Sequence, residues 1–121
     1  MNRIIIADDS ATARMVIKRC LEIAGFKDAD FLEAGHGQDV LDLLEKGPAD
    51  LLVTDLTMPK MTGVELTKEL MRIRPDIPVI LCTGFSEQIN PEQAKSIGIK
   101  EFLYKPLIVR DMAEAIRRAL D

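Results

Sequence analysis

Carboxylate, hydroxyl and ammonium side chains stand just after short apolar segments of this 121-residue chain. They are Asp8, Asp9, Asp55, Thr83 and Lys105. Carboxylates that lie within a few ångströms of one another repel, so either one of them keeps its proton or a cation binds between them. A set of oxygen ligands favours a hard cation such as Mg²⁺ over zinc.

The lysine and the threonine extend this chemistry from a metal site to a phosphoryl site. The oxygens of a phosphoryl group accept hydrogen bonds and attract positive charge, which Thr83 and Lys105 can supply. A carboxylate can itself be the nucleophile that takes up the phosphoryl group. If these side chains meet in the folded protein, they indicate Mg²⁺-dependent phosphorylation of an aspartate.

The order of the elements predicts that these side chains do meet. Short apolar runs alternate with segments of helical periodicity along the chain. We expect strands at residues 3–7, 29–33, 50–54, 78–82 and 99–104, and helices at residues 11–24, 36–46, 64–73, 91–97 and 107–120. Five strand–helix units predict an α/β fold with a parallel, doubly wound sheet, in which the functional crevice lies beyond the carboxyl ends of the strands. All of the reactive side chains follow such ends.

The ends of the expected helices carry their own signals. Ser10 and Asn90 are of the type that caps a helix N-terminus, and Gly25 and Gly98 are of the type that ends one. His36, the only histidine, stands at an expected helix start. We interpret it as a cap or surface residue and not as a phosphorelay histidine, because the long helical-bundle setting of such a relay is absent.

Composition and charge predict one globular domain spanning residues 1–121. Hydrophobic residues make up 47% of the chain and the net charge is −4, which argues against disorder. No apolar run approaches the roughly 20 residues that cross a bilayer, and no signal peptide is visible, so we expect a cytoplasmic protein without a membrane partner. The acidic balance and the lack of Trp argue against direct binding of nucleic acid. Cys20 and Cys82 are expected to be buried thiols.

A family resemblance rests on four motifs that occur in order along the chain. They are Asp8-Asp9-Ser10, Asp55-Leu56-Thr57-Met58-Pro59 with Gly63, Thr83-Gly84, and Lys105-Pro106. With these motifs the whole chain resembles the receiver domains of two-component response regulators. The resemblance implies a flavodoxin-like fold, with five strands in the order 2-1-3-4-5 and five helices.

The resemblance also implies partners and a mechanism. The chain would accept a phosphoryl group on Asp55 from a phosphohistidine of a sensor histidine kinase or phosphotransfer protein. The change would then be transmitted to the surface made by the fourth helix, the fifth strand and the fifth helix, where a downstream output protein would bind. Such a domain catalyses its own phosphorylation and slow dephosphorylation, but it is mainly a signalling switch.

Individual roles follow from the resemblance in the same way. Mg²⁺ would be bound by Asp55, by Asp9 directly, by Asp8 mainly through water, and by the backbone carbonyl of Thr57. The phosphoryl oxygens would be contacted by Lys105 and, after a movement, by Thr83.

Two aromatic residues and one peptide bond complete these expectations. Phe102 occupies the aromatic switch position of the family. Tyr104 should face the same side as Phe102, because side chains alternate along a strand. The Lys105–Pro106 peptide bond would be cis, which would help to direct the ammonium group.

Other functions fit the same residues less well. A haloacid-dehalogenase-like phosphohydrolase would need a second aspartate two residues after Asp55, where this chain has Thr57. A flavodoxin-like mononucleotide binder would not place Asp8 and Asp9 beside a phosphate. A phosphorylation-independent protein-interaction module would normally have lost an acidic residue or the lysine. A stand-alone regulator and an excised or engineered module remain alternatives.

Overall fold

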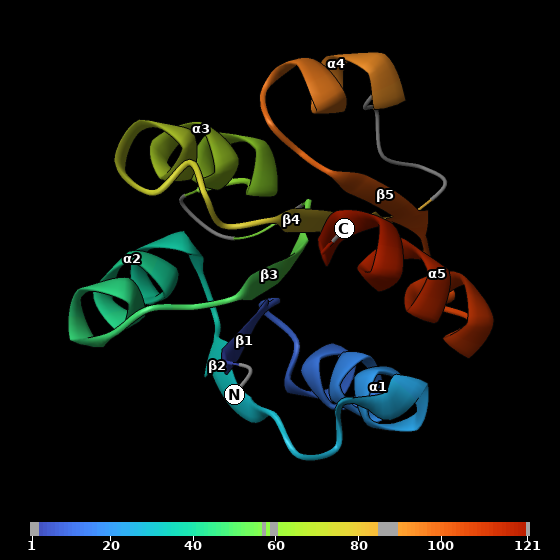
Figure 1. The fold of residues 1–121 in the computed structure, drawn as a ribbon. Helices are drawn as coiled ribbons and strands as arrows, with labels where there is room; N and C mark the ends of the chain where they lie inside the picture. The colour runs from blue at the N-terminus through green and yellow to red at the C-terminus, as the bar shows by residue number, and fades with distance from the viewer. Residues whose placement is uncertain (1–2, 57, 59–60, 85–89, 121) are drawn as a thin grey trace.

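The protein folds around a parallel sheet with helices on both faces, as seen in the computed structural model, which describes residues 3–56, 58, 61–84 and 90–120 (Figure 1). The strands are β1 (Arg3–Ala7), β2 (Asp30–Ala34), β3 (Leu51–Asp55), β4 (Val79–Thr83) and β5 (Glu101–Tyr104). Their order is β2-β1-β3-β4-β5, and each neighbouring pair is parallel. The expected flavodoxin-like fold is therefore confirmed.

The burial of the strands follows from their place in the sheet. The central strands β3 and β4 are buried along their whole length, and they read as continuous apolar runs because helices cover both of their faces. The edge strands β2 and β5 are partly exposed and carry charged residues such as Glu33 and Glu101. The interior of the sheet is thus the rigid part that holds the ends of β1, β3 and β4.

Two apolar cores separate the helices into two layers. The helices are α1 (Ala11–Leu21), α2 (Gly37–Lys46), α3 (Gly63–Ile73), α4 (Pro91–Ser96) and α5 (Val109–Leu120). One core contains buried residues of α2, α3 and α4, and the other contains those of α1 and α5. Figure 1 shows α1 beside α5, with α2 and α3 on the other side of the sheet. None of the helices in the described part of the chain has the length and apolar character that a membrane span needs.

The helix caps were predicted correctly, although several element ends move. The side chains of Ser10, His36 and Asn90 accept hydrogen bonds from backbone N–H groups in the first turns of α1, α2 and α4. The expected helix 11–24 ends as an α-helix at Leu21 and continues as a π-helical turn, η1 (Glu22–Phe26), around Gly25 with φ 113°. This φ lies in the left-handed region, which is why the turn contains a glycine.

Strands β2, β3 and β4 each begin and end one residue later than expected, and β5 begins two residues later. The hydrogen bonds of the parallel ladder decide these ends, whereas the pattern of apolar residues locates a strand only to within a residue or two. As a consequence, Asp55 and Thr83 are the last residues of β3 and β4. They belong to the rigid sheet and not to the loops that follow it.

Gly63 lies where the start of α3 packs directly behind the end of β3. Its backbone N–H donates a hydrogen bond of 2.8 Å to the carbonyl oxygen of Leu56. A Cβ atom at this position would overlap the carbonyl oxygen of Asp55 and would lie 2.8 Å from Leu81 Cδ1. Because a backbone carbonyl cannot swing away as a flexible side chain can, only glycine fits here.

We therefore expect Gly63→Ala to lower the free energy of unfolding by about 2 kcal/mol, the usual cost of forcing an extra carbon into a packed site. Urea denaturation measures this change. Gly35→Ala is the matched control, because the atoms nearest to its added Cβ lie at 3.8 and 3.9 Å, which is ordinary contact. Equal denaturation midpoints for Gly63→Ala and the unmodified protein would contradict the close packing.

Candidate functional site

Three carboxylates meet at the carboxyl edge of the sheet. Strands β1 and β3 are neighbours, and Ala7 pairs with Thr54, so the residues that follow, Asp8 and Asp55, emerge side by side. One carboxylate oxygen from each of Asp8, Asp9 and Asp55 lies within 4.8 Å of the others. Asp8 and Asp55 are buried, with 1% and 5% of their surface exposed, whereas Asp9 is exposed. The structure thus brings together the carboxylates that the sequence marked as candidate metal ligands.

Lys105 reaches this cluster from β5, across the end of β4. Its Nζ atom lies 3.0 Å from Asp8 Oδ2 and 3.0 Å from Asp55 Oδ1. The Lys105 backbone N–H donates a hydrogen bond of 2.7 Å to the carbonyl oxygen of Thr83, and the Lys105–Pro106 peptide bond is cis, as the resemblance implies. The lysine therefore bridges the buried carboxylates of two different strands.

The charge of Lys105 is stabilised by these neighbours. Partial burial by itself lowers the pKa of Lys105, but the hydrogen bonds and negative charges of Asp55 and Asp8 outweigh that effect and raise the pKa above its ordinary value. The side chain thus remains an ammonium group at neutral pH. It offers a fixed positive charge to any anion that enters beside Asp55.

The third carboxylate has a different environment. Asp8 Oδ1 accepts a hydrogen bond of 2.9 Å from the Ser10 backbone N–H, in addition to the contact of Asp8 Oδ2 with Lys105. The carboxylate of Asp9 forms no hydrogen bond or ion pair with any residue that the structure describes. Three carboxylates and one ammonium leave excess negative charge among oxygen donors, which is the environment that Mg²⁺ prefers. Asp8, Asp9 and Asp55 could therefore hold this ion.

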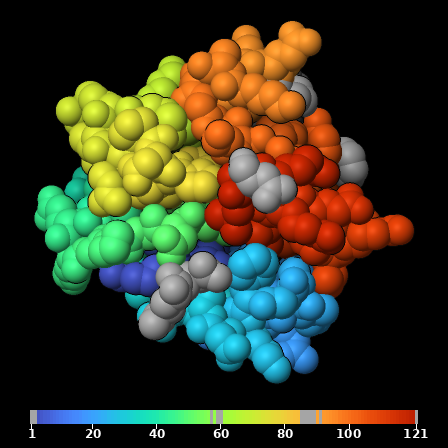
Figure 2. Space-filling view, viewed as in Figure 1, coloured from blue at the N-terminus to red at the C-terminus, as the bar shows by residue number. Residues whose placement is uncertain are grey.

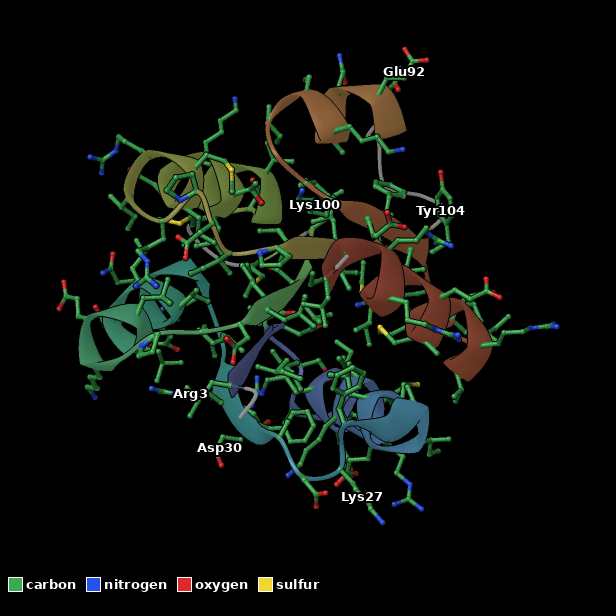
Figure 3. All side chains as sticks on the ribbon, in the orientation of Figure 1. Arg3, Lys27, Asp30, Glu92, Lys100 and Tyr104 are labelled. Carbon is green, nitrogen blue, oxygen red and sulfur yellow. The ribbon has the colours of Figure 1, made fainter. Side chains whose placement is uncertain are left out.

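The hydroxyl and the two aromatic residues lie on the β4–β5 side of the site. Thr83 is fully buried, and its Oγ1 donates a hydrogen bond of 3.3 Å to the carbonyl oxygen of Gly84. Phe102 and Tyr104 are in edge-to-face contact, with ring centroids 5.1 Å apart, so the expectation that both face the same side is confirmed. Phe102 packs against the core, whereas Tyr104 is 46% exposed and extends outward from β5 (Figure 3).

The two cysteines are buried and free, as expected. Cys82 lies opposite Asp55 in the β3–β4 ladder. Burial raises the pKa of its thiol to about 12, and the negative charges of Asp55 and Asp8 add to this, while the positive charge of Lys105 opposes it. A thiol with this pKa is not a nucleophile at neutral pH, so Cys82 acts as an apolar core residue.

Not every expected residue can be located in the site. Thr57, whose backbone carbonyl is a candidate metal ligand, lies outside the described residues. Arg14, by contrast, reaches the site although no sequence motif marked it. Its Nη1 donates a hydrogen bond of 2.6 Å to the backbone carbonyl oxygen of Asp8, and its Nε donates one of 2.9 Å to Glu33 Oε1. The only feature of the sequence that could have pointed to Arg14 as a site residue is its position in the first turn of the helix that follows the two aspartates.

Comparison with known proteins finds one family in sequence and in fold. The family model described as response regulator receiver domain matches residues 4–117. Chemotaxis protein CheY of Thermotoga maritima is 32% identical, over 96% of this chain and 95% of that protein. Response regulator receiver protein CpdR of Brucella abortus is 33% identical, over 99% of this chain and 98% of that protein. The crystal structure of a response regulator receiver domain protein from Clostridium thermocellum has a TM-score of 0.87 at 31% identity, covering 99% of this chain and 94% of that chain.

The charge distribution of the site predicts that Asp9 is destabilising in the metal-free protein. Lys105 compensates Asp8 and Asp55, so Asp9→Asn removes repulsion without removing an ion pair. We expect it to raise the free energy of unfolding by about 1 kcal/mol in EDTA, a modest value because Asp9 is exposed. Thermal denaturation in EDTA measures this change.

Asp28→Asn is the matched control, since Asp28 is an exposed aspartate in the turn before β2 and its substitution changes the net charge equally. We expect the melting temperature of Asp28→Asn to stay near that of the unmodified protein. A lower melting temperature for Asp9→Asn than for the unmodified protein in EDTA would contradict the predicted repulsion.

Proposed function

The chain belongs to the response regulator receiver domain family of two-component signalling, and from this premise we propose that Asp55 accepts a phosphoryl group from a phosphohistidine. The donor would be a sensor histidine kinase or a phosphotransfer protein, and residues 1–121 would form one receiver domain. The observation that carries the proposal is the bridge of Lys105 between Asp8 and Asp55 at the carboxyl edge of the sheet. Receiver domains interact with histidine kinases and with downstream output partners.

The proposed reaction requires little of the protein beyond positioning and charge. A carboxylate oxygen of Asp55 attacks the phosphorus, a P–O bond forms, and the P–N bond breaks with its electron pair returning to the imidazole. Asp55 is suited to this role because it ends β3 and is held by the sheet. Lys105, whose Nζ lies 3.0 Å from Asp55 Oδ1, then contacts the oxygens of the new phosphoryl group.

The acidic cluster supports a resident Mg²⁺ ion in the same site. Asp8, Asp9 and Asp55 would hold it, together with the backbone carbonyl of Thr57, which the family resemblance implies. When bound, the ion supplies positive charge to the phosphoryl oxygens. Without that charge, the excess of carboxylates would repel an incoming phosphoryl group.

Thr83 and Phe102 are the proposed switch. The Thr83 hydroxyl donates to an uncharged backbone carbonyl at 3.3 Å, so the charged oxygens of a phosphoryl group beside Lys105 would be a stronger acceptor. If Thr83 turns toward them, the packing around Phe102 at the next strand changes. Because both residues are held in the sheet, a small displacement at the site would reach β5 directly.

The proposed output surface is made of α4, β5 and α5. Of the side chains described in α4, only Ala94 is buried, so this helix has little to resist a shift between two populated states. In the space-filling view, the orange atoms of α4 and β5 and the red atoms of α5 lie on the same face of the molecule (Figure 2). A downstream output protein would recognise the changed arrangement of this surface.

Phosphorylation at Asp55 is the direct test. With a small phosphodonor such as acetyl phosphate and Mg²⁺, we expect the intact protein mass to increase by one acid-labile phosphoryl group, and we expect Asp55→Asn or addition of EDTA to remove this increase. Intact-protein mass spectrometry measures it. Asp76→Asn is the matched control, because Asp76 is exposed and pairs only with Arg74 at 3.6 Å among the described residues.

The outcomes separate the alternatives. Uptake of phosphate by Asp55→Asn at the rate of the unmodified protein would overturn the assignment of the phosphoacceptor. No uptake by the unmodified protein under any of these conditions would instead favour an interaction module that works without phosphorylation. Continuous release of inorganic phosphate from many different phosphate esters would favour a phosphohydrolase.

The switch has a separate test that uses the tyrosine of β5. Tyr104 is the only tyrosine and the chain has no Trp, so tyrosine fluorescence reports on Tyr104 alone. We expect phosphorylation to change this emission in the unmodified protein and by less than a third as much in Thr83→Ala, although Thr83→Ala should still take up the phosphoryl group. The exposed Thr12→Ala is the control. An unchanged response in phosphorylated Thr83→Ala would remove Thr83 from the switch.

A further inference from the structure

Arg14 on α1 links the loop after β1 to the neighbouring strand β2. Its Nη1 donates to the backbone carbonyl oxygen of Asp8 at 2.6 Å, and its Nε donates to Glu33 Oε1 at 2.9 Å. The Arg14 side chain is only 19% exposed, whereas that of Glu33 is 50% exposed. A surface ion pair alone would contribute little. The structurally specific contact is the one with the backbone carbonyl.

This contact acts on the carboxylate that lacks side-chain partners. The carbonyl group of Asp8 belongs to the planar peptide unit that also contains the N–H of Asp9. The carboxylate of Asp9 has no hydrogen bond or ion pair with a described residue, so among the described contacts its position follows the backbone that carries it. Whatever orients the Asp8–Asp9 peptide therefore orients this candidate metal ligand.

Two other hydrogen bonds restrain the chain on either side of this peptide. The Asp8 N–H donates to the carbonyl oxygen of Ala34 at 3.0 Å, and Asp8 Oδ1 accepts from the Ser10 N–H at 2.9 Å. Neither bond involves the carbonyl of Asp8 itself. Arg14 supplies that missing restraint through its bond to the Asp8 carbonyl. Its second bond, to Glu33, anchors the guanidinium to strand β2, so the guanidinium is held by the sheet and not by the loop.

We propose that Arg14 is a positioning residue for the acidic site: by fixing the Asp8–Asp9 peptide, its guanidinium pre-orients the Asp9 carboxylate and so strengthens the binding of a divalent cation. This inference rests on the proposed function, because it concerns the metal of the same site. Residues behind the ligands of a metal site commonly change affinity by 10-fold or more when they are removed.

The planar guanidinium is needed because two acceptors must be bound at once. The Asp8 carbonyl and the Glu33 carboxylate are contacted by different nitrogen atoms of one rigid fork. A lysine would retain the positive charge near the acidic cluster but would present a single nitrogen. Arg14→Lys therefore separates the geometric contribution of Arg14 from its long-range charge.

The experiment measures binding of Mn²⁺ to the full chain by electron paramagnetic resonance, with no phosphodonor present. We expect the dissociation constant to rise about tenfold in Arg14→Ala and to rise several-fold in Arg14→Lys. Arg72→Ala is the matched control: Arg72 is an exposed arginine on α3 that pairs with Glu69 at 2.8 Å, and its removal changes the net charge equally. We expect Arg72→Ala to remain within twofold of the unmodified protein.

A second measurement separates positioning from a general loss of stability. In the metal-free protein, we expect the amide resonances of Asp9 and Ser10 to shift and broaden in Arg14→Ala, while those of β3 and β4 stay unchanged. A purely structural role would lower the melting temperature of Arg14→Ala but would leave the Mn²⁺ affinity of the folded protein unchanged.

The outcomes for this inference and for the proposed function are distinct. Unchanged Mn²⁺ affinity in folded Arg14→Ala, or full affinity in Arg14→Lys, would overturn the positioning role, and the second result decides the matter if Arg14→Ala does not fold. Failure of the unmodified protein to bind Mn²⁺, or unchanged affinity in Asp9→Asn, would instead overturn the metal site of the proposed function.

Discussion

The repulsion among three carboxylates at one edge of the sheet is the constraint on which the rest of the site depends. Asp8 and Asp55 are buried there at a spacing that isolated carboxylates would avoid, and Lys105 compensates them through contacts of 3.0 Å to each. Asp8 and Lys105 are separated by 97 positions in the chain, so this bridge closes the fold across its whole length. Because one ammonium group offsets only part of the charge of three carboxylates, the site keeps a net negative charge that attracts a cation.

The sheet makes this arrangement possible because its strands are parallel and its centre is rigid. Parallel strands place all of their carboxyl ends at one edge, so residues from distant parts of the chain converge there without any local sequence contact. The one-residue shift in the ends of β3 and β4 matters for the same reason, since it makes Asp55 and Thr83 part of the sheet. The cap at Ser10 starts α1 directly after the two aspartates, and the close packing at Gly63 starts α3 directly behind the end of β3.

Around this rigid centre, the side chains become less buried toward α4 and β5, where the output surface is proposed. Thr83 is buried and held by the sheet, Phe102 is partly buried, and Tyr104 is nearly half exposed. The described part of α4 buries only Ala94. On the opposite side, Arg14 joins the loop after β1 to β2. The protein thus combines a candidate nucleophile, Asp55, that is held by the sheet with a candidate metal-binding loop that is held by Arg14, and with a proposed output surface that has fewer buried contacts.

The sequence by itself determined the fold class and most of the candidate residues of the site, because alternating apolar runs specify parallel strands and Asp8, Asp9, Asp55, Thr83 and Lys105 all follow such runs. Only the tertiary structure decided which atoms meet. That Lys105 contacts two carboxylates, and that Arg14 binds a backbone carbonyl, depends on strand register and side-chain direction. These in turn depend on contacts between residues far apart in the chain, which no local pattern encodes.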